Sequence, residues 1–92
     1  MSVTVRLPGA LRDATGGQTK LTASAGTLRE VIADIDRRHP GFASRVLDDA
    51  GALRSYVNVY IGDEDARSRG GSGASVPEGS EVMVIPAMAG GH

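Results

Sequence analysis

Alternation of apolar and polar residues along the chain marks four segments as strands with one buried face. In the first of them Val3, Val5 and Leu7 alternate with polar neighbours until Pro8 and Gly9 end the pattern. The second segment has a weaker apolar signal, and we expect a longish hairpin to join it to the first. The four predicted strands are residues 2–7, 19–24, 53–61 and 81–86.

A helical period replaces this alternation after residue 26. Thr27 and Glu30 have the spacing of a capping box, in which each side chain accepts a hydrogen bond from the other residue's backbone N–H. Pro40 and Gly41 then end the helical pattern. The pattern predicts one main helix and, after it, a short helical turn that begins at Phe42. The apolar stripe of the main helix consists of Leu28, Val31, Ile32 and Ile35.

The segment from Gly62 to Gly79 shows neither pattern. It is rich in glycine, serine and acidic residues and includes the run Gly70-Gly71-Ser72-Gly73. Such a composition is polar and conformationally free, so we expect a surface loop that buries little side-chain area.

The predicted order of elements, ββαββ, favours one layered α+β fold. If the first and last strands lie side by side and parallel at the centre, joined by a right-handed crossover, every apolar stripe is buried. This arrangement is a β-grasp, with a mixed four- to five-stranded sheet and one main helix packed on one face. Residues 1–86 would form the domain, and residues 87–92 a flexible C-terminal tail.

The sheet face opposite the helix is predicted to expose more apolar surface than a monomer needs. Four side chains from the third and fourth predicted strands would converge on it. We interpret this face as a patch on which a partner protein docks. Its residues are Tyr56, Tyr60, Met83 and Ile85.

Composition argues against several classes of function. A chain of 92 residues has room for one small domain, and its formal net charge of −1 gives no attraction to nucleic acid or to an anionic membrane. The sequence holds no Cys and only His39 and His92, which argues against disulfides, thiolate chemistry and a bound metal. No apolar run approaches the roughly 20 residues of a membrane span, so we expect a cytoplasmic protein.

The C-terminal end carries the candidate chemistry. After Pro86 the chain shows no cap, period or charge pattern, and it contains two consecutive glycines, Gly90 and Gly91. Because glycine has no Cβ atom, such an end can enter a narrow channel and bring a carbonyl group close to an enzyme. The pattern is typical of a carboxylate that a partner enzyme modifies.

The chain resembles the ubiquitin-like sulfur carriers of the MoaD and ThiS family over essentially its whole length. The resemblance rests on the string Tyr56-Val-Asn-Val-Tyr-Ile-Gly-Asp-Glu-Asp65, the turn Glu78-Gly-Ser-Glu-Val82 and the end Pro86-x-x-x-Gly90-Gly91. The first of these strings is most similar to the carriers that serve cysteine synthesis. Cysteine, thiamin, molybdopterin and a thiosugar all remain open as products.

This resemblance implies a carrier cycle at Gly91. An E1-like adenylyltransferase/sulfurtransferase would use ATP to adenylate the Gly91 carboxylate, and a sulfur donor would displace AMP to leave a thiocarboxylate. A sulfur-accepting biosynthetic enzyme would then receive the sulfur through the docked tail of Met88, Ala89, Gly90 and Gly91. The carrier itself would bind no cofactor and no metal and supply no catalytic residue.

His92 departs from the family pattern, in which active carriers end at the second glycine. One interpretation is a precursor from which a zinc-dependent peptidase removes His92, and the other is a residue left by an affinity tag or merely a frayed end of the chain. Two other functions stay open beside the carrier: a ubiquitin-like modifier attached to lysines of other proteins, and a non-covalent binding module.

Overall fold

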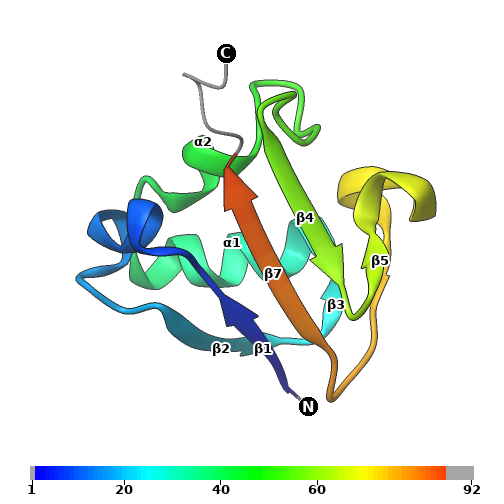
Figure 1. Cartoon of the computed structure of the whole chain (residues 1–92), viewed down its shortest axis with the longest axis horizontal. Helices are drawn as coiled ribbons and strands as arrows, with labels where there is room; N and C mark the ends of the chain where they lie inside the picture. The colour runs from blue at the N-terminus through cyan, green and yellow to red at the C-terminus, as the bar shows by residue number, and fades with distance from the viewer. Residues whose placement is uncertain (1, 87–92) are drawn as a thin grey trace.

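The computed structural model describes residues 2–86, which form a five-stranded mixed sheet covered on one face by a helix (Figure 1). The strand order is β2-β1-β7-β4-β5, and a separate two-stranded ribbon pairs β3 with β6. The strands are β1 (Ser2–Arg6), β2 (Lys20–Ser24), β3 (Gly26–Thr27), β4 (Val57–Ile61), β5 (Glu64–Asp65), β6 (Ser75–Val76) and β7 (Glu81–Pro86). The helices are η1 (Gly9–Thr15), α1 (Leu28–Arg38), α2 (Phe42–Val46), η2 (Ala66–Arg69) and η3 (Gly71–Gly73), where η denotes a 3-10 helix.

The first and last strands are parallel neighbours at the centre of the sheet, which confirms the predicted β-grasp arrangement. Val5 of β1 lies opposite Val82 of β7, and β4 pairs antiparallel with the other side of β7. The register keeps the alternation of each strand in phase, so that one sheet face is apolar throughout. Figure 1 shows α1 crossing behind this face.

Helix α1 begins and packs as its sequence predicts. Thr27 Oγ1 accepts a hydrogen bond from the Glu30 N–H at 3.2 Å, and Glu30 Oε1 accepts one from the Thr27 N–H at 2.8 Å. The helix buries the four predicted stripe residues against the sheet. Phe42 and Val46 of α2 are fully buried beside them, which confirms the short second helix. The core therefore lies between α1, α2 and one sheet face.

The prediction of a polar surface loop over residues 62–79 is wrong. This segment contains β5, η2, η3 and β6, and it buries Ala66, Ala74 and Val76 to 1% exposure or less. The Ala74 carbonyl also accepts a hydrogen bond from the Leu28 N–H at 2.8 Å. The glycines of residues 62–79 allow tight 3-10 turns, and these turns bring small side chains against the first turn of α1.

Two further element boundaries differ from the sequence prediction. The third strand begins at Val57 rather than at residue 53, because a turn precedes it in which the Val57 N–H donates to the Arg54 carbonyl. The connection between the first two strands is not a simple hairpin but contains η1, which buries Leu11 and Thr15. The Thr15 hydroxyl is satisfied there by donating to the Gln18 carbonyl at 2.6 Å.

Gly26 leaves the space that the capping box of α1 needs. A Cβ atom added at this position would lie 2.5 Å from Glu30 Oε1, and the backbone φ is +155°. We expect Gly26→Ala to displace the Glu30 carboxylate and to lower the free energy of unfolding by about 1 to 3 kcal/mol. Gly9→Ala is the matched control, because its Cβ meets nothing within 4 Å, and urea denaturation compares the two variants.

The capping box also makes the stability loss in Gly26→Ala depend on pH. Hydrogen bonds from the Thr27 backbone and side chain lower the pKa of Glu30 below its usual 4.5. Its contribution to stability is therefore complete above pH 4.5 and is lost as the pH falls through the lowered value. The difference in free energy of unfolding between wild type and Gly26→Ala should therefore become smaller in acid. A difference that stays constant or grows there would contradict the role of the Glu30 carboxylate.

Candidate functional site

The last described strand, β7, lies at the centre of the sheet and leads to the C-terminal residues of the chain. β7 lies between β1 and β4, and its final residue, Pro86, is opposite Val57 at the beginning of β4. The predicted tail residues Met88, Ala89, Gly90 and Gly91, and the predicted processed residue His92, lie outside the described residues. The candidate site therefore consists of the described surface around Pro86, after which these residues begin.

Three of the four residues of the predicted apolar patch, Tyr60, Met83 and Ile85, occupy the sheet face opposite α1, close to this point. Tyr60 lies directly opposite Met83, and Ile85 lies opposite Asn58 on the same face. Met83 is 39% exposed and Ile85 37% exposed, whereas Tyr60 is half-buried. Tyr56 is 51% exposed and belongs to the turn before β4 rather than to the strand. We call Tyr56, Tyr60, Met83 and Ile85 the apolar patch.

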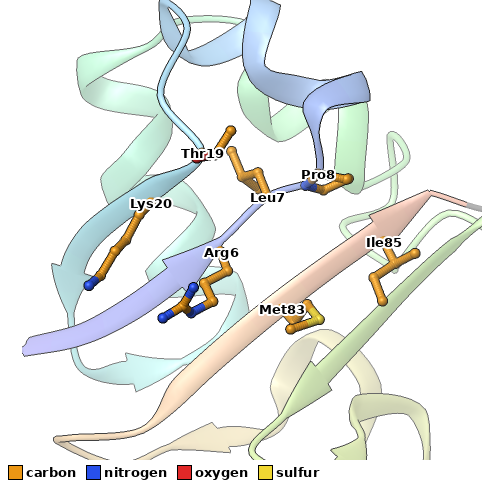
Figure 2. A pocket seen from close by; sticks show the side chains of 7 residues that line it. All are labelled: Arg6, Leu7, Pro8, Thr19, Lys20, Met83 and Ile85. Atoms are coloured by element: carbon orange, nitrogen blue, oxygen red, sulfur yellow. The ribbon is translucent and has the colours of Figure 1, made fainter.

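A groove borders the apolar patch on its β1 side (Figure 2). It has a volume of about 540 Å³, and Met83 and Ile85 of β7 form one of its walls. The other side is built by the end of β1 and the beginning of β2, with the backbone turning at Pro8. The full set of lining residues is Arg6, Leu7, Pro8, Thr19, Lys20, Met83 and Ile85.

Cationic side chains flank the apolar surface on both sides. Arg6 forms an ion pair with Glu81 and so contributes little net charge, while Lys20 lies at the groove rim. On the β4 side the Arg67 guanidinium donates to Asn58 Oδ1 at 3.2 Å and to the Arg54 carbonyl at 2.6 Å. Both contacts are to uncharged oxygens and hold the Arg67 guanidinium beside the face. An apolar centre with cationic margins is complementary to a surface with an apolar centre and acidic margins.

The sequence prediction included Met83 and Ile85 but missed the other five groove residues, although a signal for two of them existed. Arg6 and Lys20 stand at the polar positions of two alternating strands, so both were expected on the face opposite the core. Nothing local indicates that Leu7 and Pro8 lie beside Met83, since that proximity arises from the parallel pairing of β1 with β7. The groove is thus a product of topology.

No group of three or more His, Asp or Glu side chains among residues 2–86 could hold a metal ion. Among these residues, no helix has both the length and the hydropathy that crossing a membrane requires. The candidate site is the apolar patch with its adjoining groove, next to the last described residue of β7.

Comparison with known proteins identifies the family to which the chain belongs. The chain matches the ThiS family over residues 5–91. It is 42% identical over 93 residues to the sulfur carrier protein CysO of Mycobacterium tuberculosis, covering 99% of this chain and all of that protein.

Solved structures agree with this match. A crystal structure of the M. tuberculosis CysO protein superimposes with a TM-score of 0.87 at 40% identity, over 94% of this chain and 99% of that one. The chain also matches a crystal structure of the Amycolatopsis orientalis BexX/CysO complex, with a TM-score of 0.90 at 39% identity over 95% of this chain and 97% of that one. The chain therefore belongs to the ThiS family, as a sulfur carrier protein of the CysO type with a ubiquitin-like fold, a protein co-substrate rather than an enzyme.

Proposed function

We propose that this protein carries sulfur as a thiocarboxylate on the carboxyl group of Gly91. In the first step an E1-like enzyme joins the Gly91 carboxylate to the α-phosphate of ATP and releases pyrophosphate. In the second step a sulfide-equivalent donor attacks the acyl carbon, the bond to AMP breaks, and the thiocarboxylate remains. Sulfur enters already reduced, so neither step needs an oxidant or a reductant. The ATP belongs to the activating enzyme.

The observation that carries this proposal is the match to known sulfur carriers along the whole chain. The family match extends to residue 91, the second glycine of the pair. The solved complex of CysO with BexX is a precedent for a relative of this chain that assembles with a partner. A docked carrier holds its terminal group in place at the partner's active site. The partner then does not depend on a bimolecular encounter with free sulfide.

The apolar patch and the adjoining groove are the surface that we assign to partner docking. Exposed apolar side chains at the centre of the face supply area for a buried contact, and Lys20 and Arg67 at its margins supply orientation. The face adjoins the end of β7, so a protein bound there would have its active site near the tail. The activating enzyme and the sulfur-accepting biosynthetic enzyme would use it in turn.

The experiment that tests the proposal uses a chain that ends at Gly91. Incubation with ATP, a sulfide donor and the activating enzyme should raise its mass by about 16 Da, because one sulfur replaces one oxygen. Without ATP the mass should not change. An unchanged mass under complete conditions would contradict the carrier function, and conjugates with lysines of other proteins would identify a protein modifier instead.

His92 makes the 92-residue chain a precursor in this proposal, since the Gly91 carboxyl group is then part of a peptide bond. We expect the chain that carries His92 to stay inert in the same assay and to become active after a zinc-dependent peptidase removes this residue. Mass spectrometry of the protein made in its own cell checks this, with a chelator of zinc as the control. A sulfurated species that still carries His92 would contradict the processing step.

A further inference from the structure

The outer strand β2 presents an exposed sheet edge whose backbone groups alternate in direction. The Leu7 N–H donates to the Thr19 carbonyl at 2.8 Å, which makes this pair a hydrogen-bonded pair of the antiparallel ladder. Counting along the register, Leu21 and Ala23 bond to β1, whereas Lys20, Thr22 and Ser24 direct their N–H and C=O groups outward. Such a row of outward groups is a template for another strand.

Two side chains of α1 occupy groups on this edge. Asp34 Oδ2 accepts a hydrogen bond from the Ser24 N–H at 2.9 Å, and Arg38 Nη2 donates to the Thr22 carbonyl at 2.5 Å. Arg38 also approaches Asp34 Oδ2 at 3.5 Å, so the two side chains support each other. The Asp34 side chain is only 17% exposed, which places it in a fixed position between the helix and the strand.

Without these two side chains, the edge could pair with the β2 strand of a second copy of this chain. Antiparallel pairing of two β2 strands about Thr22 would set Thr22 opposite itself and Lys20 opposite Ser24. In that register the Thr22 carbonyl accepts from the other copy's Thr22 N–H, and the Ser24 N–H donates to the other copy's Lys20 carbonyl. Two of the groups that the symmetric pairing needs, the Thr22 carbonyl and the Ser24 N–H, are occupied by Arg38 and Asp34.

We propose that Asp34 and Arg38 close the β2 edge and thereby prevent two copies from joining their sheets. Neither Asp34 nor Arg38 lines the groove beside Met83 and Ile85, so closing the edge leaves that groove open. The proposal does not depend on the carrier chemistry.

The test replaces both capping side chains in the full chain, as Asp34→Ala/Arg38→Ala. In the wild type the Ser24 amide should exchange slowly with solvent, and in Asp34→Ala alone it should exchange about tenfold faster, as NMR measures at low protein concentration. At high concentration the double variant should form dimers in sedimentation velocity experiments, and the wild type should not. Circular dichroism and the urea midpoint establish that each variant remains folded.

Two matched variants separate edge pairing from general loss of charge. Arg37→Ala also removes an ion pair with Asp34 but leaves both edge contacts, so it should stay monomeric. Adding Thr22→Pro to the double variant should restore the monomer, since proline removes an N–H that points away from β1 and costs the ladder no bond. A folded double variant that is monomeric at high concentration, or dimers that survive Thr22→Pro, would overturn the proposal.

Discussion

Thiocarboxylate formation should fall by about 100-fold or more when Gly91 is replaced with alanine in a chain that ends at residue 91. The added Cβ atom would lie next to the carboxylate that attacks ATP, in a channel that a chain without side chains can enter. A small displacement of the reacting group has a large effect on rate, because catalysis here depends on positioning. Mass spectrometry of the carrier at timed intervals measures the effect.

Gly9→Ala is the control for this experiment, since the same substitution there meets no neighbouring atom and lies far along the chain from the C-terminus. It should leave the rate unchanged. If the chain with alanine at position 91 gains sulfur as fast as the wild type, the reacting carboxylate is not the one that we assign. Deletion of Gly90 and Gly91 together should abolish the mass increase completely.

Replacing Met83 and Ile85 with glutamine should raise the KM of the carrier for its activating enzyme by about 10- to 100-fold. Glutamine is similar in size to both side chains but removes their apolar surface, which is 39% and 37% exposed in the free protein. The rate at saturating carrier should change little, because the tail and its chemistry are intact. Steady-state kinetics over a range of carrier concentrations separates the two parameters.

Thr22→Gln provides the matched control for the patch. It adds a polar side chain on the same sheet face but on the edge strand β2, outside the groove. Its KM should stay near the wild-type value. An unchanged KM for the Met83 and Ile85 variant would show that the docking surface lies elsewhere, while the carrier function would remain as proposed.

Local pattern was sufficient to predict the main helix and the order of the principal strands. The capping box at Thr27 and the stripe of α1 depend on residues within one or two helical turns, so they can be recognised without knowing the rest of the fold. The parallel contact of β1 with β7 could also be predicted, because few arrangements bury two separate alternating strands and one amphipathic helix.

The segment over residues 62–79 shows where this reasoning stops. Ala66, Ala74 and Val76 are single small apolar residues among polar ones, and no period marks them as buried. Their burial depends on β4 and on the first turn of α1, which are distant in the chain. The same holds for Leu7 and Pro8 in the groove, whose neighbours come from β7.

The sequence by itself determined the main helix, the four principal strands with the apolar face of each, and the Gly-Gly end on which the proposed chemistry depends, since all of these are encoded by residues close together in the chain. Only the tertiary structure decided which exposed side chains share a surface. The groove beside Met83, the cations at its margins and the closed β2 edge each combine residues from strands and helices that meet only when the sheet assembles. Pairing across the sheet brings together positions that are 77 residues apart, as with Val5 and Val82, and no local period records such a contact.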